Sequence, residues 1–310
     1  MINFRFHLVS LIAVFLALAL GVVMGATVID EAIVDGLNAR INRVEDAADA
    51  QRERNSELQD EVERLQAFVG DEFGVAGRLD GVSVGVIAPR GVEGDQARGA
   101  VDILQTAGAD APGVLWLEEK WQLADEEARE ELADILGVPR AGAAELRAVA
   151  WTALAGAPGA PVSTTELIPA LVDAGFVEFD PVGEQGDGFD PGGYPVAGAR
   201  VLLIDQSDAG DDAKELVESM MSALVAAGIP LVMGEVYQEA EDEDGPVRGA
   251  RLAIVREDSE LRLAVSTVDD LEEVPGKVAT VLALADLPGT VGQYGLAPDV
   301  DAALPPQPPQ

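Results

Sequence analysis

The spacing of apolar residues changes along the chain and divides it into parts with different expected structures. Residues 8–28 contain no charge and read LVSLIAVFLALALGVVMGATV. At about 1.5 Å of rise per residue, a helix of this length crosses the roughly 30 Å hydrocarbon core of a bilayer. A cleaved signal peptide is the alternative, with a small-residue site near Gly25 and Ala26, but its apolar region is usually about 7–15 residues long. We therefore predict a retained transmembrane anchor within residues 1–29.

Charged residues flank this apolar span unevenly. Arg5 and His7 precede it, whereas Asp30, Glu31 and Asp35 follow it. Positive charges favour the cytoplasmic side of a membrane. The N-terminus is therefore predicted in the cytoplasm, and residues 30–310 are predicted outside it, in the cell envelope.

Small residues recur at every fourth position of the span, at Ala13, Ala17, Gly21 and Gly25. Such a stripe lets two helices approach each other closely in lipid. We predict dimerisation through Gly21 and Gly25. The alternative is that alanine and glycine are simply common in such spans.

Residues 30–70 carry the most regular apolar repeat in the chain. Its spacing alternates between three and four residues, which is the heptad pattern of a coiled coil. β-branched residues prevail at the a positions and leucine at the d positions, as in parallel two-stranded coils, and Asn55 at an a position would fix the register. The repeat comprises Val34, Leu37, Ile41, Val44, Ala48, Gln51, Asn55, Leu58, Val62, Leu65 and Val69. We predict a parallel dimeric stalk; the alternative, an amphipathic helix packed on its own domain, conflicts with the polar residues at the remaining positions.

From residue 71 onward, short apolar runs alternate with amphipathic stretches. This alternation indicates a mostly parallel sheet covered on both faces, in a Rossmann-like α/β domain over residues 71–297. The glycine-, aspartate- and proline-rich residues 180–195 are expected to form a loop, and the proline-rich residues 298–310 a disordered tail. Strands are expected at residues 82–87, 114–117, 201–204, 229–233, 252–255 and 264–267, and helices at 94–107, 124–136, 141–154, 164–174, 211–227 and 277–285.

Composition excludes several classes of function. The chain has 56 acidic and 20 basic residues, for a net charge of −36. So acidic a surface repels phosphate backbones, and we expect no nucleic acid partner. There is no cysteine, and the single histidine is His7. Disulfides, thiolate metal sites and a Ser-His-Asp triad in the outer domain are therefore excluded.

No motif for catalysis or cofactor binding occurs in the outer domain. The turn at residues 88–94 lacks the G-x-G-x-x-G of dinucleotide-binding folds. Asp205 to Asp208 follow a strand at the edge where open sheets bind ligands, but we interpret them as a cap for the next helix. The acidic run at residues 239–244 lacks ordered ligand spacing and is interpreted as a solvated loop. We predict no catalytic residue, no cofactor site and no enzyme activity.

The opening of the chain carries a specific resemblance. Residues 5–25 read R-x-H-x-x-S-L-x-A-V-F-L-A-L-A-L-G-V-V-M-G. With the heptad repeat and the acidic α/β domain, this segment resembles the actinobacterial copper transport protein B (MctB) family. The resemblance implies copper export and residence in the outer membrane. Some relatives are instead described as envelope partners that help control peptidoglycan hydrolysis during cell division.

The residue types bear on how copper would be handled. Cu(I) prefers cysteine and methionine ligands, and Cu(II) prefers histidine. The outer domain offers Met220, Met221 and Met233, which we interpret as core side chains. A role for copper is therefore expected only from the family resemblance, and no metal ligand is assigned. Two non-enzymatic functions stay open: copper homeostasis in the envelope, and a dimeric scaffold or regulator of a cell-wall hydrolase or a division-associated membrane partner.

Overall fold

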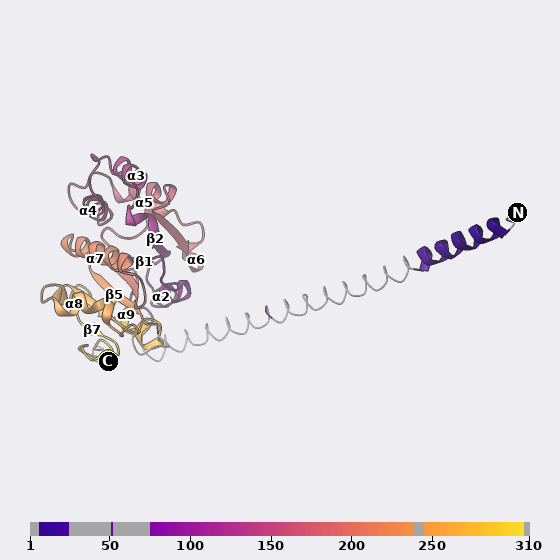
Figure 1. Cartoon of the computed structure of the whole chain (residues 1–310). Helices are drawn as coiled ribbons and strands as arrows, with labels where there is room; N and C mark the ends of the chain where they lie inside the picture. Colours follow the sequence, from indigo (N-terminus) through magenta and orange to yellow (C-terminus); the bar gives the residue numbers. More distant parts are fainter. Residues whose placement is uncertain (1–5, 25–50, 52–74, 239–244, 307–310) are drawn as a thin grey trace. The chain divides into compact units, whose positions relative to one another are not determined.

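The computed structural model of the chain describes residues 6–24, 51, 75–238 and 245–306 (Figure 1). The chain divides into two units, Met1–Leu65 and Gln66–Gln310, and each is described by itself. In the first unit, the helix Phe6–Met24 has a mean hydropathy of 2.6 and is long enough to cross a membrane. The expected apolar N-terminal helix is thus confirmed over these residues. Gly21 lies within it with open space around its α-carbon, whereas Gly25 and the stalk residues from Val34 to Val69, Gln51 excepted, lie outside the described residues.

The second unit is built on a seven-stranded sheet with the strand order β3-β2-β1-β4-β5-β6-β7. All neighbouring strands run parallel except β2 and β3, which are antiparallel. The expected mostly parallel α/β sheet is therefore confirmed. The strands are β1 (Val84–Pro89), β2 (Gly113–Leu117), β3 (Val177–Pro181), β4 (Arg200–Gln206), β5 (Leu231–Val236), β6 (Val265–Val268) and β7 (Gln293–Tyr294).

Helices cover both faces of this sheet, so its central strands are apolar at nearly every position. Successive residues of a strand belong to different cores: Val86 and Ala88 pack into one and Ile87 into the other. Helices α2 and α9 supply the first core, and α3, α4, α5 and α7 supply the second. The helices are α2 (Gly94–Thr106), α3 (Glu126–Leu136), α4 (Ala143–Leu154), α5 (Thr164–Asp173), α6 (Gly183–Gly186), α7 (Asp211–Ala226), α8 (Ala253–Glu257) and α9 (Val274–Asp286).

The expected strand at residues 252–255 is wrong. This segment forms the short helix α8 together with a 3-10 turn, Ala250–Leu252. Leu252 and Val255 are fully buried, whereas Ala253 and Ile254 between them are half-buried. That spacing is helical, but four apolar residues are too few to separate a helix from a strand.

Two strands at the edges of the sheet were not expected. β3 is buried only at Val177, and its last residues, Asp180 and Pro181, begin the stretch that was expected to be a loop. At the opposite edge, β7 contains only Gln293 and Tyr294. Both strands lack the continuous apolar run that marks the central strands, so the pattern gave no signal for them.

The chain after β7 stays in contact with the domain. Asp299 and Asp301 bind arginines of the domain, Ala302 bridges to Tyr294, and Leu304 packs against the core on the α2–α9 face. These residues therefore belong to the folded domain and not to the disordered tail expected from residue 298. Residues 307–310 lie outside the described residues.

Tyr194 fixes the chain between α6 and β4 to the sheet. Its hydroxyl accepts a hydrogen bond from the Val86 nitrogen at 2.8 Å, and lies 2.6 Å from the Val86 carbonyl and 3.0 Å from the Gly113 carbonyl. Burial raises the pKa of this phenol above its ordinary value. The next residue passes so close that a β-carbon at Gly85 would meet the Pro195 carbonyl at 2.0 Å. Glycine is therefore required at position 85.

Candidate functional site

The first candidate for a site is the crevice between β1 and β4, where the strand order reverses. Open α/β sheets bind ligands there, beyond the carboxyl ends of the strands. In this chain the Gln206 side chain bridges the crevice: it accepts from the Glu93 nitrogen at 2.7 Å and donates to Asp208 at 2.6 Å. Arg90, after β1, is held by Glu118 and Glu178.

The cavity beside this crevice is small. It measures about 40 Å³ and lies between the ends of β1 and β2 and the start of α7, lined by residues that include Pro89, Leu117 and Asp212, whereas ligand pockets usually measure about 300–1,000 Å³. The interpretation of Asp205 to Asp208 as a helix cap is wrong, because α7 begins after Gly210 without a side-chain cap. Asp205 accepts from the Gln206 nitrogen instead, and Ser207 from the Gln238 nitrogen. Both side chains thus bond to the backbone at the ends of β4 and β5.

A second candidate is a group of buried charged side chains at the carboxyl ends of β4, β5 and β6. Glu235, on β5, is fully buried and accepts from the backbone nitrogens of Gly249 at 2.7 Å and Arg251 at 2.8 Å. Burial raises the pKa of this carboxyl to about 7, although both hydrogen bonds act in the opposite direction. Its two hydrogen bonds connect the segment before α8 to the sheet.

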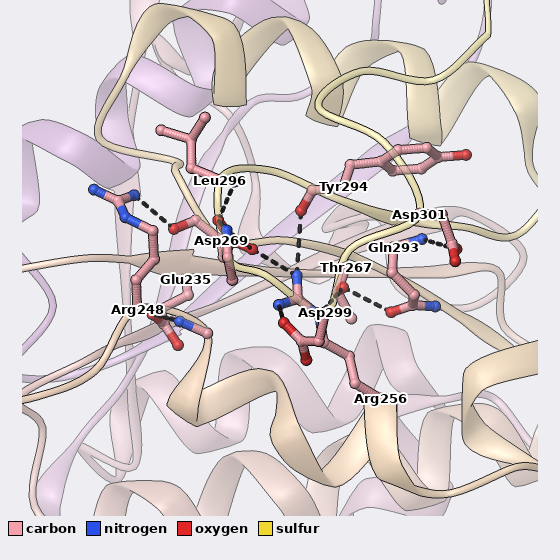
Figure 2. Close-up of polar contacts among 12 residues, drawn as sticks. Glu235, Arg248, Arg256, Thr267, Asp269, Gln293, Tyr294, Leu296, Asp299 and Asp301 are labelled. Carbon is pink, nitrogen blue, oxygen red and sulfur yellow. Dashed lines mark hydrogen bonds and ion pairs between the residues drawn. The ribbon is translucent and has the colours of Figure 1, made fainter.

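Directly after β6, Asp269 occupies the centre of this group (Figure 2). It accepts from the Arg256 guanidinium at 2.8 Å and from the Leu296 and Ala297 nitrogens at 2.7 and 3.2 Å. Arg256 also donates to Thr267 at 3.0 Å and to Asp299 at 3.0 Å. One carboxylate thus joins β6, helix α8 and the segment that follows β7.

Its neighbour Asp270 has a different environment. The side chain is buried, and neither carboxyl oxygen has a hydrogen-bond partner among the described residues. Burial, followed by the charges of Asp269 and Glu272, raises its pKa to about 6. Glu272 itself is paired with Arg248 at 2.6 Å.

This group of buried charges was not expected from the sequence. A signal for it was present, because an acidic residue ends or follows each of β4, β5 and β6, at Asp205, Glu235 and Asp269-Asp270. Because parallel strands bring their carboxyl ends to one edge of a sheet, these residues had to meet. What the pattern lacked was the identity of the partners, which come from α8 and from the chain after β7.

Metal-binding residue types do not gather in the part of the chain that the structure describes, where no set of three histidine, cysteine, aspartate or glutamate side chains is placed to hold a metal ion. Met220 and Met221 of α7 and Met233 of β5 are fully buried in the core on the α7 face of the sheet. The interpretation of these methionines as core side chains is confirmed. Buried thioethers of this kind fill space between apolar neighbours.

A larger cavity lies at the opposite edge, near the amino ends of β1 and β4. It measures about 680 Å³, and none of its lining residues is charged. Glycine, alanine, serine and threonine line most of it, with Tyr194 on one side. Among the described residues, none of the buried polar side chains without a hydrogen-bond partner lines this cavity.

Fold and candidate sites together define an α/β protein with an apolar N-terminal helix, whose sheet carries a group of buried charged side chains at the carboxyl ends of β4 to β6. The chain belongs to the family described as copper transport outer membrane protein, MctB, whose sequence model matches residues 1–305. The resemblance expected from residues 5–25 is thus confirmed over nearly the whole chain.

Curated relatives agree with this assignment. Proteins of Mycobacterium bovis and Mycobacterium tuberculosis, each named copper transporter MctB, are 28% identical over 95% of this chain and 96% of their own length. A Mycobacterium leprae protein of the same name is 25% identical over 99% of this chain and 100% of its own length. The similarity therefore includes the α/β domain as well as the N-terminal helix.

Proposed function

We propose that this chain is a non-enzymatic, membrane-anchored envelope protein that serves copper transport. The observation that carries the proposal is the family match over residues 1–305. That match covers both the apolar helix Phe6–Met24 and the α/β domain. The names of the mycobacterial relatives support the same function, and they give no support to a scaffold for a cell-wall hydrolase.

The proposed arrangement is a dimer with its N-terminus in the cytoplasm and residues 30–310 outside it. Arg5 and His7 before the apolar helix support this orientation. The heptad repeat from Val34 to Val69 supports a parallel coiled-coil stalk. The family is described as an outer membrane protein, whereas the orientation proposed here places the apolar helix in the membrane that borders the cytoplasm.

Copper handling in this proposal is indirect. Cu(I) is bound in proteins chiefly by sulfur ligands, and the three methionines of the α/β domain are enclosed in its core. A single apolar helix encloses no channel by itself. The chain would therefore act on copper together with a partner protein of the envelope.

Cellular copper content tests the proposed function. The gene for this chain is deleted in its own host, the cells are grown with added copper, and cell-bound copper is measured by mass spectrometry. If the chain serves copper export, cells that lack the gene should contain more copper than wild-type cells. Expression of the full chain should return the copper content to the wild-type level. A matched control carries a cleavable signal peptide in place of residues 1–29, and it should fail to restore the wild-type level because the anchor is lost. Unchanged copper after deletion would contradict the proposal.

A further inference from the structure

The fully buried charged side chains of the described domain are all in one place, and their charges do not balance. They are four carboxyls and two guanidiniums, each at most 6% exposed, at the carboxyl ends of β4 to β6 and on the segment beside them. They comprise Asp205, Glu235, Asp269, Asp270, Arg251 and Arg256. If every group were ionised, this cluster would hold two uncompensated negative charges.

The pairings identify which carboxyls carry the excess. Asp269 is bonded to Arg256 at 2.8 Å, and Asp205 lies 3.6 Å from Arg251. Among the described residues, Glu235 accepts only from the two backbone nitrogens named above, and the Asp270 carboxyl has no hydrogen-bond partner in any other residue. Glu235 and Asp270 are therefore the unmatched pair.

The surroundings of both groups add negative charge rather than remove it. The charge of Asp269, directly after β6, raises the pKa of Glu235, and the charge of Arg256, on α8, lowers it. The charges of Asp269 and Glu272 raise the pKa of Asp270, and the charge of Arg248 lowers it. Arg248 is already bonded to Glu272 and to the Asp269 carbonyl.

A buried carboxylate without a counter-charge is costly enough that the group takes up a proton instead. Opening of the structure would return each carboxyl to water, where its ordinary acidity is restored. Proton binding therefore favours the closed arrangement, and proton loss favours the open one.

We propose that Glu235 and Asp270 form a proton-sensitive latch, which holds residues 245–252 on the sheet in acid and loosens them toward neutral and alkaline pH. The pKa values of about 7 for Glu235 and about 6 for Asp270 place the transition near neutrality. The latch acts on the segment that supplies Arg248 and Arg251, and so on the side chains that close this edge of the sheet. Acidity of the envelope would thus control the exposure of that edge.

Hydrogen exchange at individual amides of the full chain in detergent micelles tests the latch. The reporters are the Gly249 and Arg251 amides, which bond directly to Glu235. The internal reference is the Leu296 amide, which bonds to the charge-matched Asp269. After correction for intrinsic exchange, the reporters should lose at least about tenfold in protection between about pH 5 and about pH 7.5. The reference should change less.

Two neutral variants and one control complete the test. Glu235→Gln and Asp270→Asn should each flatten the pH dependence of the reporters. Glu257→Gln, which alters an exposed carboxyl of α8, should leave it unchanged. Equal protection of the wild-type reporters at both pH values overturns the proposal, and this result needs no variant. The proposal is also overturned if the reporters in both neutral variants lose as much protection with rising pH as they do in the wild type.

Discussion

The guanidinium of Arg256 and the carboxylate of Asp269 form an ion pair at 2.8 Å with both side chains at most 1% exposed. Arg256 comes from α8 and Asp269 from the end of β6 (Figure 2). The carboxylate also bonds to the backbone at Leu296 and Ala297. This pair therefore joins three segments of the domain that lie apart in the sequence.

Replacing Arg256 with methionine should destabilise the domain by about 3–5 kcal/mol, because Asp269 would be left as a buried unpaired charge. The free energy of unfolding is measured by urea titration. Arg262→Met is the matched control, since Arg262 and Asp301 form a pair that is 35% and 50% exposed, and exposed pairs contribute about 0–1 kcal/mol. Equal losses in the two variants would contradict the role assigned to Arg256.

Tyr194→Phe should lower the free energy of unfolding by about 1–3 kcal/mol. The substitution keeps the ring but leaves the buried Val86 nitrogen without its hydroxyl acceptor. Thermal unfolding followed by circular dichroism measures the loss. Tyr237→Phe is the control, because Tyr237 is half-buried and its ring contact with Arg248 is retained. A wild-type melting temperature for Tyr194→Phe would show that the hydroxyl contributes nothing.

Asp270 should make stability depend on pH. Its pKa is raised from 3.8 to about 6 in the folded chain, so the folded state binds more protons than the unfolded state between these values. Its contribution to stability is complete below about pH 4 and is lost as the pH rises through about 6, by about 2–3 kcal/mol in total.

Asp270→Asn removes this titration. Relative to the wild type, the variant should be more stable at about pH 7.5 and should differ least at about pH 4. Urea midpoints at several pH values measure the difference. A variant whose stability follows the wild-type pH profile throughout would exclude Asp270 as the group responsible.

Lysine at both Leu58 and Val62 should convert the predicted dimer into a monomer, because the charges would be buried in the coiled-coil seam. Analytical ultracentrifugation of residues 30–310 measures the mass, since without the anchor no contact through Gly21 and Gly25 can hold the two chains together. Lysine at Glu57 and Glu63, which lie at outer heptad positions, is the control and should leave the dimer intact. A monomeric wild type would contradict the stalk itself.

Much of the fold could be predicted from the sequence, because its central strands and long helices are marked by local patterns. The run Val201–Ile204, buried on both faces, predicts β4 directly. β3 and β7 were missed because edge strands lack such a run, and α8 because Leu252 to Val255 suits either structure. These errors concern short elements whose conformation is set by neighbours distant in the sequence.

The buried charged cluster could be predicted only in part. The acidic residues at the ends of β4, β5 and β6 are visible in the sequence once the strands are placed in order. That Asp269 would find Arg256 and that Asp270 would find no partner depends on the position of α8 and of the chain after β7. Tyr194 is a similar case, because nothing near it in the sequence indicates that its hydroxyl enters the ladder between β1 and β2.

The most direct test of the account is an anaerobic calorimetric titration of the full chain in detergent with Cu(I). Indirect copper handling predicts no tight stoichiometric binding, because Met220, Met221 and Met233 lie in the core. The result should be the same for a Met220→Leu, Met221→Leu double variant. Tight binding by the wild type that this variant abolishes would contradict the account and would make the chain itself a copper carrier.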